Sequence, residues 1–231
     1  MVKPSTRIGN LMAAEKMFGD LSPRVLRDLE TVTMTNTYPA GAILFGEAEP
    51  ARGVYLVTRG KVKLSVCARD GRTLILRIAS EGDALAVAAA ISRRGLETTA
   101  ETLEPCEIRF IRQTDLLRLM RTHAEFTFWV TCQLSLNYNS ACREIRDLML
   151  SESASERLAR LLVHWLPPGE AGPSCQLKLA MTHEEIGQMI GTSRETVTRL
   201  LGGFKKQHLI QLRGSTLLIP NRMALESLIT T

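Results

Sequence analysis

The segment from Thr182 to Leu201 contains the residues with the clearest capacity for chemistry. Thr182, followed three residues later by Glu185, forms a capping box, which predicts a helix start because each residue satisfies a backbone N–H of the other. Gly191 suits the left-handed conformation that ends a helix, and Ser193 suits the N-cap of the next one. Two short helices joined by a glycine turn predict a helix-turn-helix.

The second of these helices would present polar side chains able to read the edges of base pairs. Arginine can donate two hydrogen bonds to guanine, and glutamate can accept one from the cytosine amino group. The alternative to DNA binding is an ordinary solvent-exposed helix surface, on which Arg and Glu at helical spacing form ion pairs. The candidate base-reading residues are Arg194, Glu195, Thr198 and Arg199, and the further candidate DNA contacts are Thr182, Ser193, Thr196, Lys205 and Arg213.

These helices need a supporting scaffold, and the sequence around them predicts one. Residues 209–219 indicate two strands around an Arg213-Gly214-Ser215 turn, which is the wing of a winged helix-turn-helix. An amphipathic helix is expected over 157–165, capped by Ser153 or Ser155.

A long helix is expected over 113–150, where proline and glycine are absent. Apolar residues within it recur at steps of four and three, as in the seam of a two-stranded coiled coil. The pattern favours a homodimer over a helix packed on its own domain. The predicted dimer interface consists of Leu134, Tyr138, Ala141, Ile145 and Leu148.

The N-terminal half reads as short strands separated by glycines, from about residue 38 to 112. Val62, Leu64 and Val66 alternate with polar residues, which is typical of a strand with one buried face. The Ala68–Gly71 segment contains Asp-Gly and predicts a hairpin turn. The expected fold is α+β: an N-terminal antiparallel β-roll (1–112), a dimerisation helix (113–150) and a C-terminal winged helix-turn-helix (151–231).

Composition limits the class of protein. The 231 residues are 45% hydrophobic and carry a net charge of only +5, so any DNA contact must come from a few well-placed residues. No apolar run is long enough to cross a membrane and no secretory signal is recognisable, so a cytoplasmic location is expected. The five cysteines lack metal-ligand or disulfide spacing and are expected to be reduced and mostly buried.

No metal or catalytic site is expected either. His183-Glu184 matches the first half of a H-E-x-x-H zinc motif, but Gly187 stands where the second histidine belongs. No set of nucleophile, base and orienting group is recognisable, so the chain is not expected to be an enzyme.

Together these segments resemble the cyclic-AMP receptor protein/FNR superfamily of bacterial transcription regulators, from about residue 20 to 225. The matching stretches are YPAGAILFGEAEPARGVYLVTRGKVKLSV, ARDGRTLILRIASEGD and EEIGQMIGTSRETVTRLL. In receptors of the cyclic-AMP type an Arg-Glu-x-x-x-Arg set reads a TGTGA-like half-site. The resemblance therefore implies this role for Arg194, Glu195 and Arg199, with double-stranded DNA and RNA polymerase as partners.

The sensor departs from the cyclic-AMP-binding pattern. Val87 stands where family members have a ribose-binding glutamate, and Leu96-Glu97-Thr98-Thr99 replaces the phosphate-binding pair, so cyclic AMP is not expected to bind. An iron–sulfur cluster is disfavoured because no cysteine precedes Cys67, and haem because all four histidines lie outside the roll. The pocket is either filled by side chains or takes another effector; the residues considered are Val87, Ala88, Arg93, Arg94, Cys142 and Arg143.

One rival function stays open at this point. The chain could be a cytoplasmic small-molecule sensor whose C-terminal domain contacts proteins instead of DNA. A steep salt dependence of binding to a palindromic duplex separates the two, because phosphate contacts release counterions.

Overall fold

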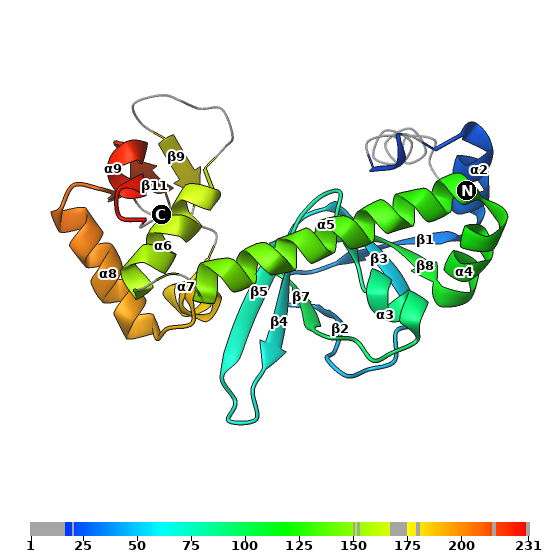
Figure 1. The fold of residues 1–231 in the computed structure, drawn as a ribbon, viewed down its shortest axis with the longest axis horizontal. Helices are drawn as coiled ribbons and strands as arrows, with labels where there is room; N and C mark the ends of the chain where they lie inside the picture. The colour runs from blue at the N-terminus through cyan, green and yellow to red at the C-terminus, as the bar shows by residue number, and fades with distance from the viewer. Residues whose placement is uncertain are drawn as a thin grey trace. The chain divides into compact units, whose positions relative to one another are not determined.

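The computed structural model describes residues 17–19, 21–149, 151, 153–166, 175–178, 181–213 and 216–229. The chain forms two compact units, one of residues 1–66 with 76–140 and one of residues 67–75 with 141–231 (Figure 1). The units thus divide inside the long helix, and the expected division after residues 112 and 150 stays a prediction.

Eight strands of the N-terminal half form two antiparallel sheets, ordered β1-β8-β3-β6 and β2-β7-β4-β5. This confirms the predicted antiparallel β-roll. At the predicted hairpin between β4 and β5, the N–H of Gly71 donates to the carbonyl of Ala68 (2.9 Å) with φ of +84° at Gly71. The strands are β1 (Thr33–Tyr38), β2 (Ile43–Phe45), β3 (Gly53–Arg59), β4 (Val62–Cys67), β5 (Thr73–Ala79), β6 (Ala84–Leu85), β7 (Thr99–Thr102) and β8 (Cys106–Arg112).

Two expectations for this region were wrong in part. Val62 is buried but so is Ser65, which lies on the opposite face of β4, so the strand is covered on parts of both faces instead of one. Among the four cysteines with described side chains only Cys106 is buried. Cys67 is exposed, because it ends β4 next to the hairpin turn.

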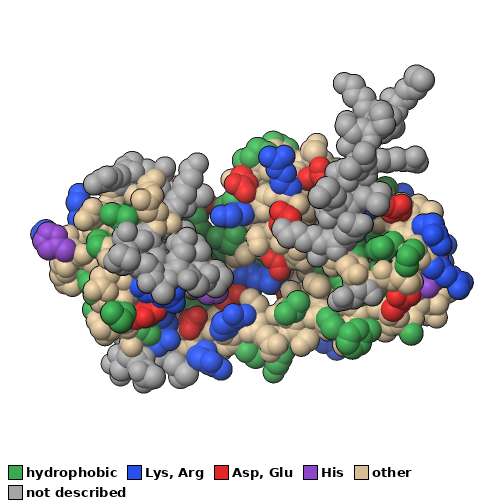
Figure 2. Space-filling view, turned by 90° about the horizontal axis from the view of Figure 1, so that it is seen from above, with side chains coloured by type: hydrophobic (Ala, Val, Ile, Leu, Met, Phe, Trp, Pro, Cys, Tyr) green, Lys and Arg blue, Asp and Glu red, His purple; other side chains and the backbone are tan. Residues whose placement is uncertain are grey.

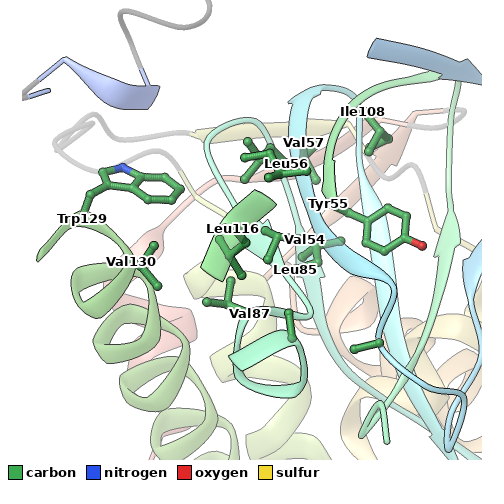
Figure 3. Packing of buried hydrophobic residues seen from close by; sticks show 14 of the residues in the cluster. Val54, Tyr55, Leu56, Val57, Leu85, Val87, Ile108, Leu116, Trp129 and Val130 are labelled. Carbon is green, nitrogen blue, oxygen red and sulfur yellow. The ribbon is translucent and has the colours of Figure 1, made fainter. Parts of the chain in front are cut away.

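The core of the roll lies on both sides of the sheet that contains β3, against the second sheet and against the helices. Figure 3 shows Val54 of β3 facing Leu116, with Leu85 and Val87 close by, while Tyr55 points to the other side of its strand. Each of these side chains is less than one tenth exposed. Apolar burial of this kind is the main stabilising contribution to a domain of this size.

Helix α2 (Pro23–Val32) begins with proline in its first turn, and α3 (Val87–Ser92) is a short helix beside β3. Two non-glycine residues with left-handed backbone conformations flank α3, Ala86 (φ +62°) and Arg93 (φ +59°). The side-chain amide of Gln113 donates to the carbonyl of Ala90 (2.9 Å) and ties α3 to the start of α4.

The helix expected over 113–150 is two helices, α4 (Gln113–Thr122) and α5 (Ala124–Met149). The break is at His123, whose backbone is extended and whose Nε2 lies 3.0 Å from Asp28 Oδ2 on α2. The N-terminal turns of α5 are anchored in the roll: Trp129 is buried, contacts the ring of Phe18 at a tilt and donates its indole N–H to the Met17 carbonyl (3.0 Å).

The C-terminal half forms a second core, and its elements confirm the winged helix-turn-helix. Ser153 caps α6 by accepting from the N–H of Glu156 (3.1 Å), as one of the two predicted caps. The wing strands pair with each other and with β9, in the order β10-β11-β9; the turn at 214–215 lies outside the described residues. The elements are α6 (Ala154–His164), β9 (Cys175–Lys178), α7 (His183–Ile190), α8 (Arg194–Lys206), β10 (Gln211–Arg213), β11 (Thr216–Ile219) and α9 (Arg222–Glu226).

The packing of α7 against α8 depends on Gly187. A Cβ atom added to this buried residue would lie 2.7 Å from the backbone carbonyl oxygen of Thr192, closer than real Cβ contacts. Because the obstacle is backbone, the turn between the helices would have to move. Gly202, on α8, is a useful contrast, because an added Cβ there meets nothing within 4 Å.

We expect Gly187→Ala to lower the free energy of unfolding of the C-terminal unit by about 1–3 kcal/mol through overpacking. Gly202→Ala should instead raise it by about 0.5–1 kcal/mol, because alanine loses less backbone entropy in a helix. Chemical denaturation followed by circular dichroism measures both. Equal effects of the two substitutions would show that the close approach at Gly187 does not limit the packing.

Candidate DNA-binding surface

The first helix of the motif, α7, starts at a complete capping box. The Thr182 N–H donates to Glu185 Oε2 (2.8 Å), and the Glu185 N–H donates to Thr182 Oγ1 (3.2 Å). Gly191 ends the helix with φ of +62°. Each of these features was predicted. Thr182 is exposed, but its hydroxyl has a structural role as the cap.

The second helix, α8, separates its residues into two faces. Val197, Leu201 and Phe204 are buried against the rest of the unit. The opposite face presents exposed side chains at its N-terminal end, and these are the predicted base-reading residues Arg194, Glu195, Thr198 and Arg199. A helix held in this way can enter a major groove with its first turns directed at the bases.

The N-cap of α8 uses two further predicted residues. Ser193 Oγ accepts from the N–H of Thr196 (3.2 Å) and lies 3.2 Å from Thr196 Oγ1. Ser193 is exposed and Thr196 half-buried, so both lie at the helix end that would face DNA phosphates. Ser193, which was predicted both as a cap and as a DNA contact, is the N-cap.

The charges on this face have opposite signs and remain available at neutral pH. Backbone N–H bonding and the Ser193 hydroxyl lower the pKa of Glu195 below its ordinary value, so its carboxylate is a hydrogen-bond acceptor throughout the physiological range.

Arg194 shares a pocket of about 330 Å³ with Thr182, His183 and Glu184. The pocket lies where the first turns of α7 and α8 approach each other.

Sequence reasoning assigned no role to one residue of this face. His183, in the first turn of α7, places its Nδ1 2.8 Å from Oγ1 of Thr198 on α8. The two residues are fifteen positions apart, and only the turn between the helices brings them together. Placing the sequence on the known geometry of a helix-turn-helix would have indicated that these two residues lie close together.

The remaining predicted DNA contacts lie near the end of α8 and in the wing. Lys205 is exposed in the last turn of α8. Arg213 ends β10, but its side chain lies outside the described residues. On the face shown in Figure 2, Lys and Arg side chains are interspersed with Asp and Glu, so no single basic surface covers it. The net charge of only +5 indicates that recognition would depend on individual side chains.

The residues considered for an effector pocket differ in their surroundings. Val87 is 2% exposed and belongs to the roll core, as do Ala84, Ala89 and Ala90. Ala88, Arg93 and Arg94 are exposed. On α5, Cys142 is half-buried and Arg143 is exposed. Ala84, Ala89 and Ala90 therefore pack in the roll core together with Val87, whereas Ala88 faces solvent.

The predicted dimer residues also differ. Tyr138, Ala141 and Ile145 are exposed, whereas Leu134 packs against the roll core and Leu148 is half-buried with a methyl group near Gly191. The exposed face of α5 follows a neighbouring seam. Its seven positions are spaced three and four apart, and all but the half-buried Cys142 are exposed: Phe128, Thr131, Ser135, Tyr138, Cys142, Ile145 and Met149.

Two classes of site find no support in the part of the chain that the structure describes. No group of three or more His, Cys, Asp or Glu side chains there could hold a metal ion. Within the same residues, no helix combines the length and the apolar character that crossing a bilayer requires.

Comparison with known proteins agrees with both halves of the structure. Residues 35–123 match the cyclic nucleotide-binding domain family, and residues 156–228 match the Crp-like helix-turn-helix domain family. The fold is similar to that of FixK2 from Bradyrhizobium japonicum, with a TM-score of 0.75 and 23% identity over 87% of this chain and 98% of the other.

Curated relatives extend the match across both domains. The cAMP-activated global transcriptional regulator of Pasteurella multocida is 29% identical over 79% of this chain and 88% of its own length. The cyclic AMP receptor protein of Thermus thermophilus is 25% identical over 94% of this chain and 98% of its own. These relatives are regulators and not enzymes. With a cyclic nucleotide-binding domain followed by a Crp-like helix-turn-helix domain, the chain is homologous to the transcription regulators of the cyclic-AMP receptor protein/FNR family.

Proposed function

We propose that the protein is a homodimeric regulator that binds palindromic DNA with TGTGA-like half-sites through α8. The observation that carries this proposal is the exposure of Arg194, Glu195 and Arg199 on one face of a helix whose other face is buried. The three residues combine donors for guanine with an acceptor for cytosine. Their spacing corresponds to the Arg-Glu-x-x-x-Arg set of receptors of the cyclic-AMP type.

Dimerisation through α5 follows from its exposed seam. Tyr138 is 70%, Ile145 61% and Met149 77% exposed in the single chain, which is unusual for large apolar side chains on a helix. A second copy of the same helix would cover them by knobs-into-holes packing. A two-fold dimer would in turn place two copies of α8 at half-sites about one helical turn of DNA apart.

The sensor of this regulator acts without cyclic AMP, either with another effector or with none. Val87 packs in the core, so it offers neither a carboxylate nor an open surface to a ribose. The side-chain amide of Asn137 on α5 donates to the carbonyl of Ala84 (3.2 Å), so protein atoms already join α5 to this segment. We also infer a cytoplasmic location and contact with RNA polymerase, as expected of a family that regulates transcription.

Base reading is tested with Arg199→Ala. Binding to a TGTGA-N6-TCACA duplex should weaken by about 1–3 kcal/mol, with discrimination lost at one base pair, because a bidentate contact to guanine is removed. Lys205→Ala is the matched control: it should weaken specific and scrambled duplexes alike and reduce the salt slope by about one. Fluorescence anisotropy at several salt concentrations measures both. Wild-type protein without preference for the operator would contradict the proposal.

The dimer is tested with Ile145→Glu. A buried, unpaired carboxylate in the seam should convert the dimer to a monomer at micromolar concentration and abolish operator binding. Arg143→Glu, on the same helix but off the seam, should leave the dimer intact. Sedimentation velocity separates the two states, and a dimeric Ile145→Glu variant would show that α5 is not the interface.

We predict that cyclic AMP does not bind, and this can be measured directly. Isothermal titration of the purified protein with cyclic AMP should give no saturable heat in the micromolar range, and the nucleotide should leave operator affinity unchanged. Saturable micromolar binding would overturn the interpretation of Val87 and of the missing phosphate-binding pair.

A further inference from the structure

The contact between His183 and Thr198 links the non-reading helix of the motif to the reading surface of α8. Thr198 lies four residues after Arg194 and three after Glu195, so the three side chains share one face of the helix. Thr198 is exposed on that face, and His183 approaches it from the first turn of α7. Any change in the state of His183 therefore reaches a residue at the centre of the reading surface.

The hydroxyl of Thr198 has two partners. Thr198 Oγ1 donates its single hydroxyl proton to the backbone carbonyl of Arg194, at 3.0 Å. The same oxygen lies 2.8 Å from His183 Nδ1, so with the hydroxyl proton on the Arg194 carbonyl the Nδ1–H tautomer of the ring would donate in this bond.

These two bonds change what Thr198 can offer to a base. Its proton is used by the Arg194 carbonyl and one of its lone pairs by His183, so the hydroxyl has no donor left for a base. Both bonds also fix the χ1 angle, which gives the methyl group one position. What the side chain presents on the exposed face is a methyl group in a defined place, with a single remaining lone pair.

We propose that His183 is a positioning residue for sequence recognition: it holds Thr198 so that Thr198 selects a thymine in each half-site by methyl–methyl contact. Apolar contact with the C5 methyl is a recognised way to read thymine in the major groove. The inference rests on the proposed binding of α8 to DNA, and it adds one specified base contact. His183 acts only through Thr198.

Replacement of thymidine by deoxyuridine tests the methyl contact, because uracil differs from thymine only in lacking the C5 methyl group. Each thymine of the operator half-site is replaced in turn, and the ratio of the two Kd values is measured for wild type and for Thr198 variants. At one position the wild type should bind deoxyuridine about fourfold more weakly, as expected for one buried methyl group. Thr198→Val, which keeps the methyl group and replaces the hydroxyl by a second methyl, should retain this ratio, and Thr198→Ser, which has no methyl, should lose it.

A second pair of variants tests the role of His183. The amide nitrogen of Asn can stand where Nδ1 stands, whereas that of Gln stands closer to the Nε2 position. His183→Asn should therefore retain the fourfold ratio, and His183→Ala and His183→Gln should reduce it to less than twofold. A direct contact of His183 with phosphate would change all affinities together and leave the ratio unaltered. Circular dichroism melting confirms that each variant is folded.

The outcomes separate this inference from the proposed function. Equal affinity of the wild type for operator and scrambled duplex contradicts DNA reading by α8 altogether. Operator-specific binding with the same deoxyuridine ratio in wild type and Thr198→Ser overturns the methyl contact alone. Loss of the ratio in Thr198→Val as well as Thr198→Ser would show that the hydroxyl does the reading, and a ratio unchanged in His183→Ala would remove the positioning role.

Discussion

The burial of one face of α8 is the constraint on which the reading surface depends. Val197, Leu201 and Phe204 can leave water only in one rotational setting of the helix, and that setting turns Arg194 and Arg199 outward. The absence of a side chain at Gly187 lets α7 approach closely enough to keep the turn in place. The orientation of the proposed reading surface is thus set from the hydrophobic side of the helix, by residues that are themselves buried.

The sequence predicted those parts of the structure that are encoded locally. The capping box at Thr182, the left-handed Gly191 and the Ser193 cap are short-range hydrogen-bonding devices, and all three are present. The break at His123 was not predictable, because no proline or glycine marks it; it coincides with a contact to Asp28, ninety-five residues away. The pair of His183 and Thr198 was missed for the same reason, since its partners meet only after the helices have packed.

The seam of α5 shows where periodicity reaches its limit. Leu134 and Leu148 have the residue type and the spacing that are expected in a dimer seam. Leu134 nevertheless packs against the roll core. An apolar helix face indicates that other side chains will cover it, but it does not show whether they belong to the same chain or to a second copy. The neighbouring exposed seam, rotated by one position, shares only Tyr138 and Ile145 with the predicted interface.

The short helix α3 has a consequence for how the sensor tolerates change. Its flanking residues, Ala86 and Arg93, hold left-handed backbone angles that cost L-amino acids roughly 1–2 kcal/mol each. A six-residue helix cannot offset this from its own hydrogen bonds. Its conformation is therefore imposed by buried neighbours such as Ala89 and Ala90 and by the bond from Gln113. Local preference and tertiary packing disagree here, so loosening of the surrounding core would favour a change of backbone conformation in this segment.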